Sequence, residues 1–118
     1  MQNKAWGQLL SIDLAECDRN RLTDGNGLSE FCRMLCKEID MVPVGETIIK
    51  RFGRGELEGF SAMQFIETSS ITIHLDEFGG RAFIDIFSCK SFDNDKAKNF
   101  CKRFFAAKKV RFRNFYRY

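Results

Sequence analysis

The sequence predicts an α+β fold, a two-layer sandwich in which helices pack on one face of an antiparallel β-sheet. Six short apolar segments have the composition and alternation of strands, and two longer segments repeat apolar side chains at helical spacing. Most links between these segments are only a few residues long, which favours antiparallel neighbours because parallel strands need a long crossover. With 118 residues, the chain is expected to form a single domain, residues 1–118.

The N-terminal half is expected to supply a strand, a helix and a second strand. Asn26 or Ser29 is the expected cap of the helix. A connector with the only proline, Pro43, follows the helix, and a turn with three glycines ends this half. The buried stripe of the helix is Leu28, Phe31, Leu35 and Ile39. The expected bounds are 7–14 and 46–52 for the strands, 16–27 for a polar loop, 29–39 for the helix and 53–59 for the glycine-rich turn.

The C-terminal half is expected to supply three strands, a helix and a last strand. Apolar Ile71, Ile73 and Leu75 alternate with Thr72 and His74, a pattern typical of a strand with one buried face. The last helix is amphipathic, with an apolar face formed by Ala97, Phe100, Cys101, Phe104 and Phe105. The expected bounds are 60–67, 71–75, 82–87 and 110–116 for the strands and 94–108 for the helix.

Composition narrows the cellular context and the partners. No run of about eighteen apolar residues exists, so no membrane span is expected, and the N-terminus lacks the apolar core of a secretory signal. Five cysteines, an odd number, favour reduced thiols in the cytoplasm. Cys32 and Cys36 are interpreted as core thiols, because the chain has neither a C-x-x-C pair nor a second histidine to complete a metal site. We therefore expect no metal.

The basic and aromatic segment 108–118 allows two interpretations. Alternating positive charges and rings suit single-stranded nucleic acid, where they contact phosphates and stack on bases. The same pattern suits an edge strand with Val110 and Phe112 inward and Arg111 and Arg113 outward, where charge discourages edge-to-edge aggregation. The net charge of +3 is mild, so the edge strand is favoured and no nucleic-acid partner is expected.

The sequence most strongly indicates a reactive site at a serine between two predicted strands. Ser69 lies at this junction, and His74 is the only histidine. No G-x-S-x-G motif surrounds the serine, so a conventional Ser-His-Asp hydrolase is not indicated. If the strands form hairpins, Cys89 approaches Ser69 from the next strand and Ser61 from the preceding one, giving a Ser, Ser, His and Cys cluster at one end of the sheet. The alternative is four unrelated polar residues on a half-solvated sheet face.

Several motifs fall in the register of one known family. Ser69, Thr72-Ile73-His74, Gly80 and Asp85-Ile86-Phe87-Ser88-Cys89 match without a gap. Gly59-Phe60-Ser61 matches a Gly-x-Ser eight residues before the central serine, and Glu16-Cys17-Asp18 matches the end of a first strand. On these residues, and over almost the whole chain, the sequence resembles the small prokaryotic S-adenosylmethionine decarboxylases, which are pyruvoyl-dependent.

This resemblance implies an autocatalytic proenzyme. Ser69 would attack the carbonyl of Thr68, with Ser61 assisting, and His74 would help remove the Ser69 α-proton, yielding a β chain of residues 1–68 and an α chain of residues 69–118. The covalent pyruvoyl group derived from Ser69 would form a Schiff base with the substrate amine, and Cys89 would reprotonate the α-carbon after loss of CO2. The implied product serves polyamine (spermidine) biosynthesis, and a homodimer follows by analogy.

The departures from the family pattern affect substrate recognition and the cleavage site. Thr68 and Ser70 replace the usual Glu and His that flank the serine, so cleavage before Ser70 is a minor alternative. The ribose-binding Glu falls on Phe78, or on Glu77 after a one-residue shift, and Phe52 is the expected adenine-stacking ring. These changes leave open a decarboxylase of ornithine or arginine, or a non-catalytic regulatory homologue. The carboxylates for a cationic substrate would be Asp13, Glu16, Asp76 and Glu77.

Overall fold

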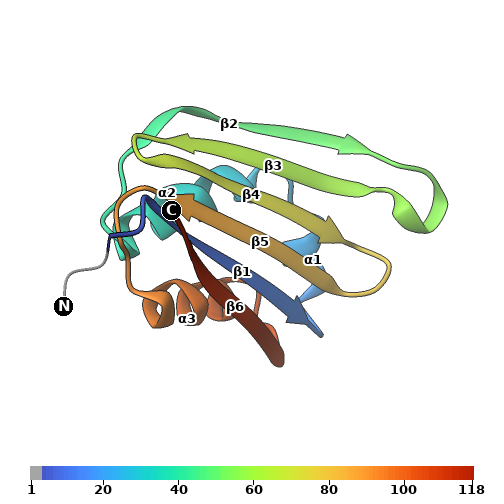
Figure 1. Ribbon diagram of the computed structural model, residues 1–118. Helices are drawn as coiled ribbons and strands as arrows, with labels where there is room; N and C mark the ends of the chain where they lie inside the picture. The colour runs from blue at the N-terminus through green and yellow to red at the C-terminus, as the bar shows by residue number, and fades with distance from the viewer. Residues whose placement is uncertain (1–3) are drawn as a thin grey trace.

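Six strands form one antiparallel sheet in the order β2-β3-β4-β5-β1-β6, and the helices α2 and α3 lie on the same side of it (Figure 1). The computed structural model describes residues 4–118. The predicted α+β sandwich is confirmed. The strands are β1 (Gly7–Ala15), β2 (Pro43–Phe52), β3 (Gly59–Ile66), β4 (Ser69–Asp76), β5 (Arg81–Ser88) and β6 (Lys109–Arg117). The helices are α1 (Arg19–Leu22), α2 (Gly27–Glu38), α3 (Asn94–Phe104) and a 3-10 turn, η1 (Gly55–Leu57).

The two faces of the sheet differ in polarity and exposure. On the helix side of β4, Ile71 and Ile73 are fully buried, as the alternation predicted. On the other side, which we call the open face, Thr72 is half-buried and His74 is exposed. The open face also carries exposed Met63 and other apolar side chains in the same register: Ile48, Phe52, Phe65 and Phe115. No helix of the described chain covers this face (Figure 1).

Aromatic rings and thiols fill the space between the sheet and the helices. Phe31 of α2 is fully buried, and its ring centroid lies 5.0 Å from that of Phe104 and 5.2 Å from that of Phe105. Cys32 and Cys36 face the same core, which confirms their interpretation as core thiols. Burial raises the pKa of Cys32 to about 12 and that of Cys36 to about 11, so both stay protonated at neutral pH.

Three local predictions needed correction. The expected loop 16–27 contains the short helix α1, because the Asp18 carboxylate accepts a hydrogen bond from the Asn20 N–H and caps it. The last helix ends at Phe104 rather than near 108, because Ala106 adopts a positive φ of 48° and turns the chain into β6. The second strand begins at Pro43, three residues earlier than expected, through a bulge between Val44 and Ile48.

Strand β6 pairs with β1 along its whole length at one edge of the sheet. Arg111 and Arg113 pair with Asp13 and Ser11 and so belong to the open face, whereas Phe112 lies on the helix side, where the Lys98 ammonium sits 4.6 Å from its ring centroid. The predicted edge strand is therefore confirmed. None of the helices in residues 4–118 is long and apolar enough to cross a membrane.

Candidate active site

A tight hairpin connection holds the peptide bond between Thr68 and Ser69. Ile66, the last residue of β3, pairs with Ser69, the first residue of β4, so only two residues connect the strands. Ser69 has a φ of 155°, a region that residues with a Cβ rarely adopt. Such a conformation costs about 1–3 kcal/mol and persists only where the surroundings enforce it. The hairpin thus places local backbone strain directly after the Thr68 carbonyl.

The next strand supplies a hydrogen-bond donor to that carbonyl. Ser88 at the end of β5 pairs with Ser69, and the backbone N–H of Cys89 donates to the Thr68 oxygen at 2.9 Å. The expectation that the hairpin brings Cys89 beside Ser69 is confirmed. An N–H in this position polarises the carbonyl and can stabilise negative charge that develops on its oxygen. The Cys89 side chain is exposed and borders a hollow of about 180 Å³ beside Trp6.

Ser61 and His74 form a second polar pair, at the other end of β4. They are opposite each other in the β3–β4 register, and the Ser61 Oγ lies 2.9 Å from the His74 Nδ1. When Nδ1–H donates to Ser61, the Nε2 lone pair is free to accept a proton. His74 lies five positions after Ser69 along the strand, which corresponds to roughly 16 Å. The predicted single cluster is therefore wrong for one chain, because the hairpin register that joins Ser61 to His74 moves both away from Ser69.

A pocket of about 590 Å³ opens beside the Ser61–His74 pair. Phe52, the expected adenine-stacking ring, lines it, and 60% of its surface is exposed. Phe78, which occupies the position of the ribose-binding Glu when no shift is made, also lines it, and so does Phe83, which had no predicted role. Their signal is weak in sequence, since Phe78 lies in a turn and Phe83 reaches the pocket only through its pairing opposite His74. The pocket therefore combines aromatic walls with a serine–histidine pair.

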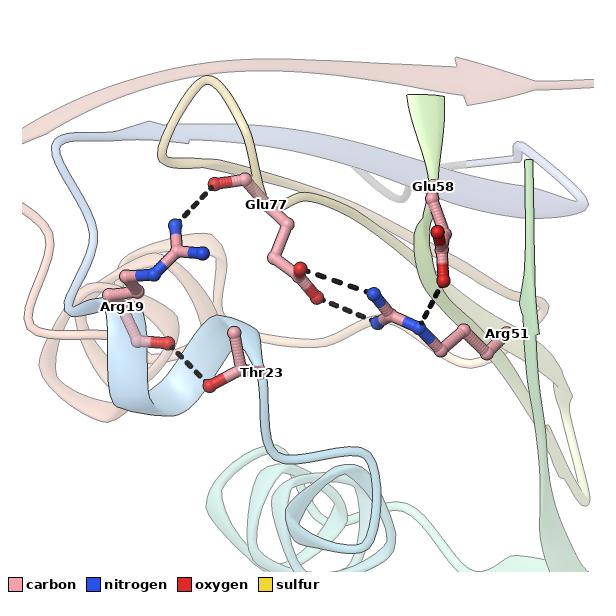
Figure 2. A network of polar contacts seen from close by, with 5 residues as sticks. All are labelled: Arg19, Thr23, Arg51, Glu58 and Glu77. Atoms are coloured by element: carbon pink, nitrogen blue, oxygen red, sulfur yellow. Dashed lines mark hydrogen bonds and ion pairs between the residues drawn. The ribbon is translucent and has the colours of Figure 1, made fainter. Parts of the chain in front are cut away.

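Glu77 is not among the residues that line this pocket and belongs instead to an ion-pair network with Arg51 (Figure 2). Both of its carboxylate oxygens accept from Arg51, at 2.7 and 3.2 Å. Arg51 also donates to Glu58 at 2.9 Å, and Arg19 donates to the Glu77 backbone oxygen at 3.4 Å. The hydrogen bonds from Arg51 hold the pKa of Glu77 below its usual range. This network ties the turn after β4 to the end of β2 and to α1. Thr23, the residue that follows α1, donates its hydroxyl to the Arg19 backbone oxygen.

The other three carboxylates predicted for a cationic substrate are dispersed. Asp76 lines the pocket, but its carboxylate accepts from the Gly79 N–H at 2.9 Å and from Arg81 at 2.7 Å. Glu16 pairs with Lys109 at 3.2 Å. Asp13 is exposed on the open face and borders a different hollow, of about 270 Å³. Within residues 4–118, no group of three or more His, Cys, Asp or Glu side chains is placed to hold a metal ion.

Comparisons with known proteins agree with each other. The family model described as S-adenosylmethionine decarboxylase matches residues 8–118. The S-adenosylmethionine decarboxylase proenzymes of two Clostridium botulinum strains, Langeland and Loch Maree, are each 32% identical over 108 residues, which cover 91% of this chain and 90% of theirs. The crystal structure of the adenosylmethionine decarboxylase from Aquifex aeolicus superposes with a TM-score of 0.81 at 18% identity, covering 98% of this chain and 92% of that one.

Proposed function

Because the chain belongs to the S-adenosylmethionine decarboxylase family, we propose that it is a proenzyme that cleaves itself between Thr68 and Ser69 and then decarboxylates S-adenosylmethionine. One observation carries this proposal. The peptide bond before Ser69 has its carbonyl oxygen held by the Cys89 N–H at 2.9 Å, and the residue after the bond is held at a φ of 155°. A polarised carbonyl beside a strained serine is suited to an intramolecular acyl shift.

In the acyl shift, the Ser69 Oγ adds to the carbonyl carbon of Thr68. The Cys89 N–H stabilises the oxygen that gains negative charge, and collapse breaks the C–N bond, leaves an ester and frees the Ser69 amine. Ser61 would assist as a hydrogen-bond partner. A base, proposed to be His74, then removes the Ser69 α-proton, and the bond between Cβ and the ester oxygen breaks. Thr68 keeps both oxygens as a carboxylate, and residues 69–118 begin with dehydroalanine.

One water then enters and one ammonia leaves, so that residue 69 becomes a pyruvoyl group. The group would be the N-terminus of residues 69–118, beside the Cys89 side chain, and the residues present fit its formation because serine, polarised carbonyl and donor are already together. When formed, it supplies a ketone that accepts the electron pair released by loss of CO2. We assign the Cys89 thiol as the acid that returns a proton to the substrate α-carbon.

The His74 and Ser61 roles require a second copy of the chain. Roughly 16 Å between Ser69 and His74 exceeds proton-transfer reach several-fold. A two-fold axis that lies between two stacked open faces and runs across the strands exchanges the ends of β4, so the end with Ser61 and His74 in one copy lies over the end with Ser69 in the other. The apolar side chains exposed on the open face give this contact a driving force. We therefore propose a homodimer with two active sites, each built from both copies.

The pocket favours S-adenosylmethionine over ornithine or arginine. The exposed rings of Phe52 and Phe78 offer flat surfaces to a nucleobase. A cationic side chain would need unpaired carboxylates, but those of Glu77 and Asp76 are already paired with Arg51 and Arg81. The free state of the five cysteines, all within the described residues, accords with a reducing compartment, and we propose the cytoplasm.

Intact-mass analysis of the purified protein tests the proposal. Cleavage at the proposed bond yields fragments of residues 1–68 and 69–118, the second lighter by one ammonia than its serine form. Release of CO2 from S-adenosylmethionine, but not from ornithine or arginine, would then establish the substrate. A chain of full length that stays unmodified after prolonged incubation would reject the proenzyme and favour the regulatory homologue.

A further inference from the structure

The hydroxyl groups of Thr68 and Ser88 form a hydrogen-bonded chain beneath the hairpin. Thr68 is the residue whose carbonyl belongs to the scissile bond. The Thr68 Oγ1 lies 2.7 Å from the Ser88 Oγ and 3.3 Å from the Met41 Sδ. The Lys90 N–H donates to the Ser88 Oγ at 3.0 Å. Ser88 and its neighbour Met41 are buried, at 0% and 6% exposed. The Ser88 Oγ also lies 3.7 Å from the Met41 Sδ, so the Thr68 and Ser88 hydroxyls hold each other and share one sulfur acceptor.

Two proton arrangements follow from counting donors. Each hydroxyl has one proton, and Met41 can only accept. If Thr68 donates to the Met41 sulfur, Ser88 donates to Thr68; if Ser88 donates to the sulfur, Thr68 donates to Ser88. The Lys90 N–H donates to Ser88 in both arrangements. In the first arrangement every member donates or accepts in one direction, and such chains strengthen each bond through mutual polarisation. The Thr68 side chain is therefore anchored from β5 on one side and from the segment after α2 on the other.

The anchor acts on the same residue whose carbonyl is held by Cys89. Ser88 forms a hydrogen bond with the side chain of Thr68, and the adjacent Cys89 N–H donates to the Thr68 carbonyl oxygen at 2.9 Å. Two attachments fix the orientation of the peptide plane relative to Ser69, which one hydrogen bond alone would leave free to rotate. The Glu67 N–H, bonded to the Val42 oxygen at 2.9 Å, adds a third point on the preceding residue.

We infer that Ser88 is a positioning residue for self-cleavage, and that it acts through the Thr68 hydroxyl. The inference rests on the proposed self-cleavage at Thr68–Ser69. It also accounts for Thr68 at the acyl position, because a β-hydroxyl there reaches both Ser88 and Met41. A valine of the same shape would bury the site equally well but would lose the 2.7 Å hydrogen bond that ties the side chain of residue 68 to Ser88. The two residues thus act as one unit, and a change in either should slow cleavage through the same loss of alignment.

The test is the rate of self-cleavage in freshly expressed full-length chain, followed by gel and intact mass. Ser88→Ala and Thr68→Val should each slow cleavage by about ten- to a hundredfold, the range expected for small misplacements of reacting atoms. Thr68→Ser keeps the hydroxyl and should cleave within a few-fold of the parent rate. Ser91→Ala removes an exposed hydroxyl outside the chain of bonds and should not change the rate. The double variant Ser88→Ala with Thr68→Val should be no slower than the slower single variant.

Folding effects are separated in a Ser69→Ala background, where every chain stays intact. The Tm of Ser69→Ala with and without Ser88→Ala then reports stability alone, and the inference requires slowed cleavage at temperatures where both are folded. A parent chain that cleaves while Ser88→Ala and Thr68→Val cleave equally fast would overturn this inference and leave the proposed function standing. A parent chain that never cleaves would overturn both. Additive slowing in the double variant would overturn the claim that the two hydroxyls act as one unit.

Discussion

The proposed division of the active site between two copies predicts complementation between two inactive variants. Ser69→Ala removes the nucleophile but keeps Ser61 and His74. His74→Ala keeps the nucleophile but removes the proposed base. Alone, each should stay uncleaved. In a mixed dimer, the Ser69 of the His74→Ala chain faces the intact His74 of the other chain, so that one of the two sites is complete and the His74→Ala chain is cleaved.

The expected yield follows from the geometry. Within one chain, roughly 16 Å separates Ser69 from His74, against about 3 Å for proton transfer, so no side-chain movement closes the gap. If copies associate at random and in equal amounts, about half of the His74→Ala chains enter mixed dimers and about half should be cleaved. The Ser69→Ala chains should remain intact throughout.

Co-expression with a mass tag on one chain measures this yield directly, because intact mass identifies which chain was cut. Mixing the purified variants tests whether subunits exchange. A co-expressed pair in which both chains stay whole, although gel filtration shows mixed dimers, would refute a site shared between copies. Cleavage of Ser61→Ala alone at the parent rate would further exclude Ser61 from the acyl shift.

Three further outcomes are expected. Cys89→Ala should still cleave, because the backbone N–H remains, but its decarboxylation rate should fall about 10²–10⁴-fold, as measured by CO2 release per cleaved chain. Phe52→Ala should raise the KM for S-adenosylmethionine by about tenfold with a smaller change in kcat, as loss of base stacking predicts. Arg51→Ala should destabilise the fold at neutral pH through loss of the pair with Glu77. Since the folded pKa of Glu77 is lowered from 4.5, that pair's contribution is present above 4.5 and disappears as acid protonates the carboxylate, which denaturation at several pH values measures.

Most of the fold could be predicted from periodicity and turn residues. The alternation of Ile71, Ile73 and Leu75 identified β4 and its buried face, and burial of these side chains against the helices is what fixes both. The errors lie where a single backbone conformation or cap decides the outcome. Ala106 at a φ of 48° ended α3 early, and the Asp18 cap produced α1 in a stretch that composition marks as loop. A positive φ at an alanine has no signal in propensity patterns, and the Asp18 cap is a local signal that the polar composition of residues 16–27 outweighed.

The candidate site could be predicted in its residues but not in its geometry. Spacing and resemblance identified Ser61, Ser69, His74 and Cys89, and the hairpin argument placed Cys89 correctly. The strands were expected to end at 67 and begin again at 71, which leaves the pairing register open. A two-residue connection fixes that register, places Ser61 opposite His74 and thereby moves the pair along β4. Glu77 likewise needed the structure, since its pairing with Arg51 spans 26 positions of sequence.

The distribution of these residues along β4 has a consequence for when cleavage occurs. The strained Ser69 and the Cys89 donor are in place within one chain, and so is the Ser61–His74 hydrogen bond, but they lie at opposite ends of the strand. Under the proposed roles of Ser61 and His74, neither half completes the reaction by itself, so an isolated chain is expected to hold its reactive peptide without cutting it. In the proposed dimer, stacking of the open faces would bury exposed apolar side chains and bring the two halves together in the same step. The proposed dimer would thereby couple maturation to assembly, and dilution of newly made chains should delay cleavage in proportion to the delay in dimer formation.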